Sequence, residues 1–355
     1  MDRVQKLLAK LSLAANEAVL ISGRSNIFYL SGYTGEGLLL LFENIRCIIT
    51  DSRYTEQAGR QAPGFGVEMI VAGVKHTEIA YRLLCENAVS RLYYEDDQFT
   101  VRDFESMRGV MPGITFESVN NAPEKLREVK DEGEIALISE ACDISCDAFD
   151  WLLGELRPGM TERQSRQLLD NRMLELGADK IAFDTIVAGG VNGSLPHAIP
   201  GDRRFEKGDM ITFDFGAKKG GYCADMTRTV AIGQPKDEMK RIYETVLLAQ
   251  RSCEEALAPG KRCRDIDALA RKIIDDAGYH GRFGHGLGHS VGIDIHEEPR
   301  LSPLSDALLV PGTVITVEPG IYVPGLGGGR IENTCVVTRD GGRTLVRAQK
   351  DLVVL

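Results

Sequence analysis

The stretch "GDMITFDFG" (Gly208–Gly216) aligns without gaps against "GTVITVEPG" (Gly312–Gly320), and this internal match decides how the second part of the chain is expected to fold. The first stretch alternates large apolar residues with smaller or polar ones, which is typical of a half-buried strand. Asp214 in the first stretch falls on Glu318 in the second. Self-similarity of this kind predicts a domain built from two related halves.

The residues before the two stretches repeat as well. A Pro-Gly turn, a polar cap and an amphipathic helix begin at Pro158 and again at Pro259. Each copy continues with a His-x-x-Pro segment, which starts at His197 in the first copy and at His296 in the second. Because the match extends over a helix, a histidine-bearing segment and a strand, we predict a pseudo-twofold arrangement of two half-domains.

A hairpin is predicted where "DFGAKKGGYCAD" runs from Asp214 to Asp225. With Lys219 and Gly220 as the central turn residues, the antiparallel register sets Asp214 directly opposite Asp225. A register shifted by one residue would instead leave two solvated surface aspartates. The segment "DMTRTV" aligns with "ENTCVV", so Asp225 falls on Glu332 and both acids are duplicated.

Duplicated acids that converge predict a metal site. Buried like charges need neutralisation, because burying even one isolated charge costs many kcal/mol. Oxygen ligands suit divalent ions such as Mn²⁺, and two ions commonly occupy such a cage. The segment "FGHGLGHSVGIDIHEEP" brings His285, His289 and His296 close together, and its glycines argue against a helical zinc-binding pair. An imidazole ligand favours Mn²⁺, Co²⁺ or Zn²⁺ over Ca²⁺.

The composition is that of an acidic globular protein. The 355-residue chain has a net charge of -10 and a pI near 5.3, which argues against nucleic acid or an anionic membrane surface as a partner. No apolar run approaches membrane-spanning length and the N-terminus lacks a signal-peptide pattern, so we expect a cytoplasmic protein. The eight cysteines show no metal-binding spacing and are expected to be reduced core residues.

The sequence pattern of the first part of the chain predicts a separate domain. Strand-like runs alternate there with helical stretches, which indicates a small α/β domain. A polar stretch then leads into a long amphipathic helix expected from about residue 134 to residue 153. We place the boundary near Pro123, which gives an N-terminal domain over 1–123 and a second domain over 124–355.

Two glycine-rich stretches, "AGGVNGS" (Ala188–Ser194) and "GLGGG" (Gly325–Gly329), could suggest phosphate loops. Neither continues with the Lys-Ser/Thr pair and helix that such a loop requires. The second stretch is therefore expected to be a flexible hairpin connection. No functional role is assigned to the first.

At these motifs the chain resembles the pita-bread metallopeptidases and, among them, the Xaa-Pro peptidases prolidase and aminopeptidase P. The resemblance covers essentially the whole chain, because the N-terminal part is similar to the creatinase-like domain of those enzymes. It implies an α+β fold class, with a pita-bread domain preceded by a smaller α/β domain. The family's metal ligands lie in the motifs DFG, ADMTRT, GHGLGH, EPGIY and RIENT, and fall on Asp214, Asp225, His289, Glu318 and Glu332.

The resemblance implies metal-dependent hydrolysis of the Xaa-Pro bond, in dipeptides or at the N-terminus of short peptides, by a hydroxide bridging two metal ions. Mn²⁺ is the expected metal, with Co²⁺ or Zn²⁺ as alternatives. Glu318 is expected to carry protons between the attacking water and the leaving nitrogen in addition to binding metal.

Further residues receive roles by the same resemblance. His197 and His296 are expected to hydrogen-bond the substrate and the tetrahedral intermediate. His285 would line the substrate pocket, and Arg330 would hold the last metal ligand in place. Arg300 could meet a substrate carboxylate, or could equally form a surface ion pair.

Several alternatives stay open. One is a non-catalytic peptide-binding protein on the same fold, although such relatives typically lose ligands and none is missing here. A methionine aminopeptidase resembles only the C-terminal half, and creatinase shares the layout but works without metal. The sequence does not separate a dipeptidase from an aminopeptidase. A homodimer is expected by resemblance.

Overall fold

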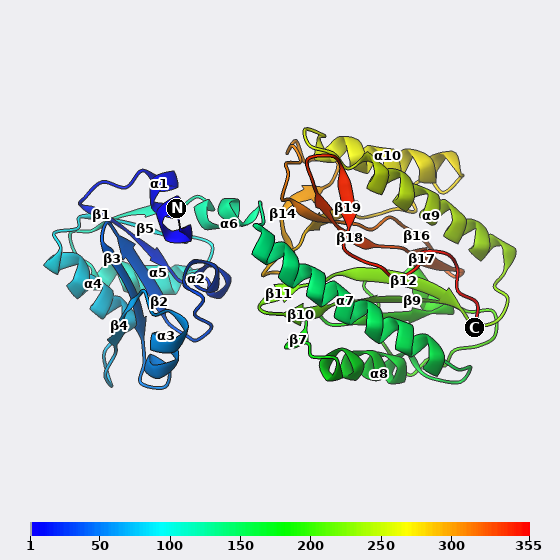
Figure 1. Cartoon of the computed structure of the whole chain (residues 1–355), viewed down its shortest axis with the longest axis horizontal. Helices are drawn as coiled ribbons and strands as arrows, with labels where there is room; N and C mark the ends of the chain where they lie inside the picture. Colours follow the sequence, from blue (N-terminus) through cyan, green and yellow to red (C-terminus); the bar gives the residue numbers. More distant parts are fainter. Residues whose placement is uncertain (1) are drawn as a thin grey trace. The chain divides into compact units, whose positions relative to one another are not determined.

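A computed structural model describes residues 2–355, which divide into two compact units, the first ending at Arg127 and the second spanning Glu128–Leu355 (Figure 1). Pro123, where the sequence places a domain boundary, lies in the last helix of the first unit. The domain limits 1–123 and 124–355 stay predictions. None of the helices in the described part of the chain combines the length and the apolar character that a membrane crossing needs.

The first unit is built on one six-stranded sheet, with the strand order β4-β3-β2-β1-β5-β6. The apolar runs expected as strands form this sheet, and its core is made by their buried side chains. The strands are β1 (Glu17–Ile21), β2 (Leu38–Phe42), β3 (Ile45–Thr50), β4 (Gly66–Met69), β5 (Arg91–Tyr94) and β6 (Thr115–Ser118). The helices are α1 (Arg3–Leu11), α2 (Arg24–Ser31), α3 (Thr55–Gln61), α4 (His76–Glu86), α5 (Val101–Val110) and α6 (Ala122–Arg127).

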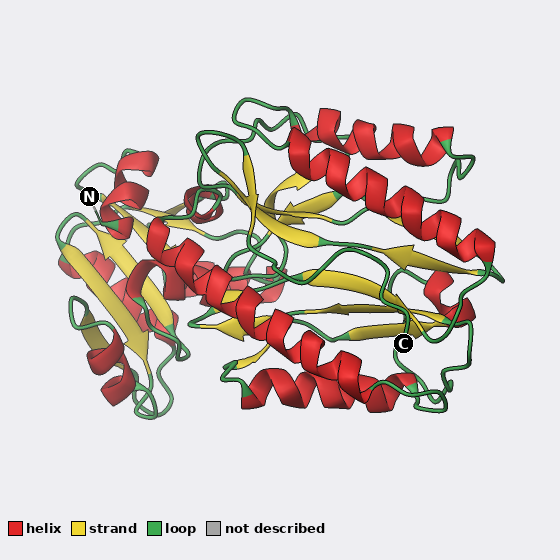
Figure 2. Ribbon diagram, turned by 45° about the vertical axis from the view of Figure 1, so that its right-hand side comes forward, coloured by secondary structure: helices red, strands yellow, loops and turns green. Residues whose placement is uncertain are grey.

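The second unit places two helix pairs along opposite sides of its strands (Figure 2). The helices are α7 (Glu132–Glu155), α8 (Glu162–Glu175), the short 3₁₀ helix η1 (Gly190–Ser194), α9 (Asp237–Ala256) and α10 (Cys263–Asp276). The strands of the first half are β7 (Lys180–Ile181), β8 (Ile186–Gly189), β9 (Met210–Phe215), β10 (Ala217–Lys219), β11 (Tyr222–Cys223) and β12 (Met226–Ala231). Those of the second half are β13 (Gly288–Ser290), β14 (Glu297–Leu301), β15 (Val314–Val317), β16 (Gly320–Val323), β17 (Gly327–Arg330), β18 (Asn333–Val337) and β19 (Gly342–Thr344).

The two halves repeat the same succession of elements. A long helix (α7 or α9) is followed by a 14-residue helix (α8 or α10). The aligned strands also correspond, because β9 pairs with β12 in the first half as β15 pairs with β18 in the second. The predicted α+β arrangement with an internal pseudo-twofold repeat is therefore confirmed.

The predicted register of the first hairpin is wrong. Lys219 pairs with Tyr222, so the central turn residues are Gly220 and Gly221, with φ values of 55° and 85°. A two-residue hairpin turn of this type needs positive φ at both positions, which glycine adopts without strain and lysine does not. As a result, Asp214 lies opposite Thr227.

Each residue of the hairpin thus faces a partner two positions further along than predicted. A shift of two residues keeps every side chain on the same face of the sheet, whereas a shift of one would reverse them. Asp225 accordingly stays buried, with 4% exposure, although it no longer faces Asp214 directly. In the second half, Val317 pairs with Asn333, and continuing this register sets Glu318 opposite Glu332.

All eight cysteines are free thiols, as expected. Seven of them are buried and Cys85 is exposed. The spacing of the cysteines therefore carries no disulfide framework in this fold.

Candidate metal centre

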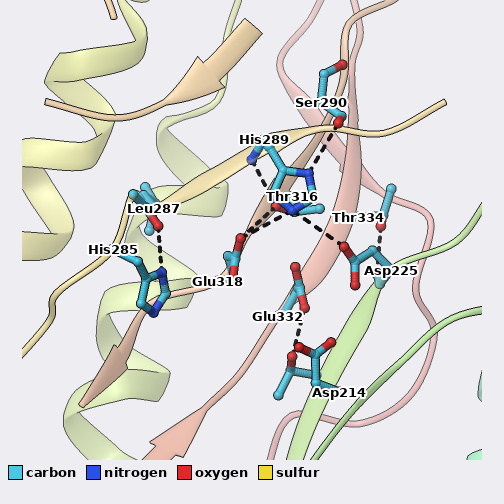
Figure 3. A network of polar contacts seen from close by, with 12 residues as sticks. Asp214, Asp225, His285, Leu287, His289, Ser290, Thr316, Glu318, Glu332 and Thr334 are labelled. Atoms are coloured by element: carbon cyan, nitrogen blue, oxygen red, sulfur yellow. Dashed lines mark hydrogen bonds and ion pairs between the residues drawn. The ribbon is translucent and has the colours of Figure 1, made fainter. Parts of the chain in front are cut away.

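One cavity of about 310 Å³ in the second unit brings together every site residue expected from the sequence. It also includes apolar wall residues such as Phe183 and Ile295. The expected residues that line it are His197, Asp214, Asp225, His285, His289, His296, Arg300, Glu318, Arg330 and Glu332. Figure 3 shows the acids and His289 pointing toward one another from different strands.

Both halves of the repeat supply acids to the cavity. Asp214 belongs to β9 and Asp225 directly precedes β12, whereas Glu318 directly follows β15 and Glu332 directly precedes β18. Backbone hydrogen bonds join the halves here, because Glu332 N donates to Thr227 O at 3.1 Å. Thr334 Oγ1 also donates to Asp225 O at 2.7 Å, so contacts between the two halves hold the acids.

The distances around His289 fit ligands of a shared ion better than hydrogen bonds. Its Nε2 lies 3.5 Å from Asp225 Oδ2 and 3.5 Å from Glu318 Oε1. Two donor atoms bound to one tetrahedral ion are about 3.4 Å apart. Ligand atoms of Asp225, His289 and Glu332 all lie within 4.8 Å of one another.

Asp214 gives a second indication that the acids fit a cation. Its Oδ1 atom is buried and has no hydrogen-bond partner among the described residues. A buried carboxylate oxygen without a donor is costly unless a cation or water satisfies it. Four carboxylates and one imidazole are a donor set that suits a borderline divalent ion such as Mn²⁺.

The electrostatics of the cavity support the same interpretation. Burial, followed by the charge of Glu332, raises the pKa of Asp225 well above its ordinary range. Burial and the charge of Asp214 raise the pKa of Glu332 to about 8, and burial also raises the pKa of Glu318. Burial lowers the pKa of His289 to about 3, so its imidazole is neutral and able to bind metal.

Arg330 connects several groups of the cavity wall. Its guanidinium donates to Asp214 Oδ2 at 2.6 Å, to Tyr322 Oη at 2.8 Å and to Thr227 Oγ1 at 3.1 Å. Thr227 Oγ1 in turn donates to Glu332 Oε2 at 2.8 Å. Arg330 therefore orients an acid of the first half directly and an acid of the second half through one hydroxyl.

Thr227 and Tyr322 were not expected as site residues. Both lie inside motifs already singled out, Thr227 in ADMTRT and Tyr322 in EPGIY. Thr227 follows Asp225 by two positions, so the strand period places both on one face. This periodicity could have indicated Thr227, whereas the contacts of Tyr322 depend on the pairing of β16 with β17.

The remaining histidines sit at different depths. His285 is half-buried, and its Nε2 lies 2.9 Å from Tyr322 Oη. Burial lowers the pKa of His285 to about 4. The ring of His296 meets the ring of His289 edge to face, with centroids 4.4 Å apart, and its pKa is lowered by burial. His197 is exposed on the segment that follows η1.

Arg300 shows the ion pair that was one of its two expected roles, and its contact with a substrate carboxylate stays a prediction. Arg300 lines the cavity, and its Nε also lies 3.3 Å from Glu298 Oε1 in an exposed ion pair. Exposed pairs of this kind contribute little stability. The guanidinium can therefore turn toward a ligand at small cost.

Comparisons with known proteins agree with the fold. Residues 136–339 match metallopeptidase family M24, and residues 3–129 match the creatinase/prolidase N-terminal domain. An uncharacterized peptidase of Bacillus subtilis, YqhT, is 39% identical over 356 residues, which cover 100% of this chain and 99% of the relative.

Solved structures are similar over the same length. An Xaa-Pro dipeptidase from Bacillus anthracis superposes with a TM-score of 0.95 at 36% identity, covering 99% of each chain. An X-Pro aminopeptidase from Thermotoga maritima gives a TM-score of 0.91 at 36% identity, covering 98% of this chain and 100% of that one. The resemblance inferred from the motifs is thereby confirmed. With a family match over more than half of its length and relatives aligned end to end, the chain belongs to metallopeptidase family M24.

Proposed function

We propose that this protein hydrolyses the bond between an N-terminal residue and proline, in dipeptides or short peptides. The observation that carries the proposal is the convergence of a complete set of acids and His289 on one cavity. Support comes from end-to-end similarity to proteins named Xaa-Pro dipeptidase and X-Pro aminopeptidase. A tertiary Xaa-Pro amide has no N–H and a fixed φ, so it calls for a dedicated site.

In this proposal two divalent ions are held by Asp214, Asp225, His289, Glu318 and Glu332. Mn²⁺ is the preferred candidate, with Co²⁺ and Zn²⁺ as alternatives, because the donor set combines oxygen atoms with one imidazole. When bound, such ions supply Lewis acidity and a water of lowered pKa.

The chain's own residues bind the peptide and move its protons. Glu318, half-buried in the cavity wall, passes a proton from the attacking water to the leaving nitrogen. His197 and His296 donate hydrogen bonds to the substrate carbonyl as negative charge develops on it. His285, held by Tyr322, shapes the pocket, and Arg330 keeps Asp214 oriented.

Arg300 bears on the choice between dipeptidase and aminopeptidase. A dipeptide ends in a carboxylate directly after proline, and an exposed guanidinium at the cavity could pair with it. The dipeptidase is therefore our first candidate. The aminopeptidase is kept as the second because the solved relatives include proteins of both names.

The wider setting belongs to the same proposal. We place the catalytic domain at 124–355 and the creatinase-like domain at 1–123. A homodimer in the cytoplasm is proposed from the family resemblance.

The test is hydrolysis of Ala-Pro, Ala-Pro-Ala, Ala-Ala and Met-Ala by metal-stripped protein, before and after addition of Mn²⁺. Metal-restored cleavage of Ala-Pro alone supports a dipeptidase, and cleavage of Ala-Pro-Ala supports an aminopeptidase. Cleavage of Met-Ala in preference to both would favour a methionine aminopeptidase. Silence on every peptide, with metal bound, would favour a peptide-binding protein.

Replacing Arg300 by Gln tests whether the protein is a dipeptidase that recognises the carboxylate after proline. We expect a higher KM for Ala-Pro, with a smaller change for a proline peptide whose C-terminus is amidated. Equal changes for both substrates would argue against a carboxylate contact.

A further inference from the structure

The two glycine-rich stretches without an assigned role contact each other. A Cβ atom on Gly193 of η1 would lie 3.1 Å from Gly328 N of β17, and one on Gly328 would overlap Gly193 O. A Cβ atom on Gly327 would lie 2.8 Å from Gly190 O. Glycine thus permits direct backbone contact between η1 in the first half and β17 in the second.

Glu162 hydrogen-bonds both ends of the segment that contains η1. Its side chain lies in the first turn of α8 and is fully buried. Its Oε1 accepts hydrogen bonds from Gly189 N and Asn192 Nδ2, both at 2.9 Å, and its Oε2 accepts one from Gly201 N at 3.0 Å. One carboxylate therefore fixes both ends of residues 189–201, which we call the His197 loop.

The position of His197 depends on this loop. In the part of the chain that the structure describes, no side chain hydrogen-bonds the imidazole of His197. The preceding residue, Pro196, offers its carbonyl oxygen to Arg330 Nη1 at 3.4 Å. The imidazole of His197 thus lines the cavity because the backbone of the His197 loop is held by other contacts. These are the hydrogen bonds to Glu162 at the ends of the loop, the glycine contact at η1 and the hydrogen bond from Arg330 to Pro196.

We propose that Glu162 is a positioning residue for His197: its carboxylate, together with the glycine contact between η1 and β17, presents the imidazole to the substrate. This inference rests on the proposed function, because it concerns the contact between His197 and the substrate. Glu162 itself does not line the cavity. Its effect on the reaction therefore passes through the loop.

The second half contains an analogous contact, at a different position of its 14-residue helix and around His285. Asp267 of α10 is buried, and its Oδ1 accepts a hydrogen bond from Leu287 N at 3.0 Å. Arg271, paired with Asp267, donates to the carbonyl oxygens of Phe283 and His285. In both halves, an acid on the 14-residue helix holds the backbone of a histidine-bearing segment.

The experiment is a double-mutant cycle with Glu162→Gln and His197→Ala in the Mn²⁺-loaded protein, with kcat/KM measured on a proline dipeptide. Glutamine keeps the shape of the Glu162 side chain, but one carboxylate oxygen becomes an NH₂ group that faces N–H donors. We expect Glu162→Gln to lower kcat/KM about 10-fold or more, since small misplacements of catalytic groups are costly. His197→Ala should lower it about 100-fold, as for loss of one oxyanion donor. The double variant should match His197→Ala alone.

Activity-independent readouts accompany the cycle. Bound metal should be unchanged in Glu162→Gln, whereas hydrogen exchange of a peptide covering 189–201 should speed up. The matched control is Asp170→Asn, a partly buried acid on the same helix whose partners are Arg166 and Thr185. We expect it to leave both activity and exchange of the loop unchanged. Should Glu162→Gln fail to fold, Asn192→Ala removes one donor and should give a smaller effect of the same direction.

Several results would overturn the inference. One is that Glu162→Gln lowers kcat/KM by the same factor in the His197→Ala background as in the unmodified protein. Another is that Glu162→Gln loses bound metal. Either result would mean that Glu162 does not act through His197. A fully active His197→Ala variant would also overturn it while leaving Xaa-Pro hydrolysis intact. If the unmodified protein cleaves no peptide, the proposed function fails. The inference is then judged on the NMR signal of the His197 imidazole, and an identical signal in Glu162→Gln would contradict it.

Discussion

Glu95 in the first unit and the carboxylates of the cavity in the second are all buried acids, but they differ in their hydrogen-bond donors. Glu95 accepts hydrogen bonds from Ser22 N, Gly23 N, Ser22 Oγ and Asn26 Nδ2. No hydrogen bond from a described residue reaches the carboxylate of Asp225, and the imidazole Nε2 of His289 lies 3.5 Å from its Oδ2.

This difference separates a structural acid from a ligand. A carboxylate surrounded by donors is satisfied within the fold, so it needs no ion. The cavity carboxylates face one another: the charge of Glu332 raises the pKa of Asp225, and the charge of Asp214 raises that of Glu332. Glu332 accepts a hydrogen bond from the Thr227 hydroxyl but from no backbone N–H among the described residues, so these acids need a cation. Glu162, with three donors, belongs with Glu95 rather than with the cavity.

Metal removal should have the largest effect. Chelation is expected to abolish peptide hydrolysis and to lower the melting temperature, because the cavity acids then repel one another. An ion present at 100 times its dissociation constant stabilises the folded state by about 2.7 kcal/mol. Calorimetry with and without Mn²⁺ measures this shift. Glu95→Gln protein should show the same metal-induced shift, and hydrolysis that survives exhaustive chelation would contradict the assignment.

Glu332→Gln should come next in size. The loss of a ligand is expected to lower activity by more than about 100-fold, because even residues that only support ligands cost 10- to 100-fold. In chelated protein the same substitution should leave the melting temperature unchanged or raise it, because one of the facing charges is gone. Metal content and melting curves test both statements. A destabilised metal-free variant would mean that the hydrogen bond from Thr227 to Glu332 outweighs the repulsion between the facing charges.

Arg330→Met should have an intermediate effect. Asp214 would lose its ion-pair partner at 2.6 Å, the only one it has among the described residues, and Thr227 would lose a donor. We expect metal affinity to fall about 10- to 100-fold, as for other groups that support ligands. Arg330→Lys is the matched control, because it keeps the charge but cannot reach all three oxygens. If the lysine variant binds metal as the unmodified protein does, charge alone explains the role of Arg330.

The sequence predicted the cavity acids because strand periodicity fixes which face each side chain occupies. Duplication of Asp214 and Asp225 at Glu318 and Glu332 indicated that these faces meet. The register was wrong because the turn type depends on backbone angles at Gly220. The error left the site intact only because it amounted to two positions, which preserves the face.

The supporting contacts could not be predicted in the same way. Glu95 lies 73 residues from its donor Ser22, and Lys130 lies 167 residues from Glu297, with which it forms a buried ion pair at 2.9 Å. No local pattern distinguishes such acids from ligands. The contact between the glycine-rich stretches was missed for a related reason, since glycine signals a close approach without indicating the partner.

Glu95→Gln tests the structural side of the comparison and should have no effect on catalysis. Glutamine presents an N–H group to backbone donors, so we expect a loss of about 1–3 kcal/mol in the free energy of unfolding. Metal content and kcat/KM should stay within about 2-fold of the unmodified protein. Urea unfolding provides the stability measurement. A loss of metal binding would show that Glu95 influences the cavity after all.

The smallest expected effect is the pH dependence of the stability difference between the unmodified protein and Glu95→Gln. Burial raises the pKa of Glu95 above its ordinary value of 4.5, so the folded chain keeps a proton that the unfolded chain has already released. Stability contributed by Glu95 therefore falls as pH rises from 4.5 toward the raised pKa. Glutamine does not titrate, so the stability advantage of the unmodified protein over Glu95→Gln should shrink as the pH rises above 4.5. An advantage that grows with pH would mean that the backbone donors outweigh burial and lower the pKa of Glu95.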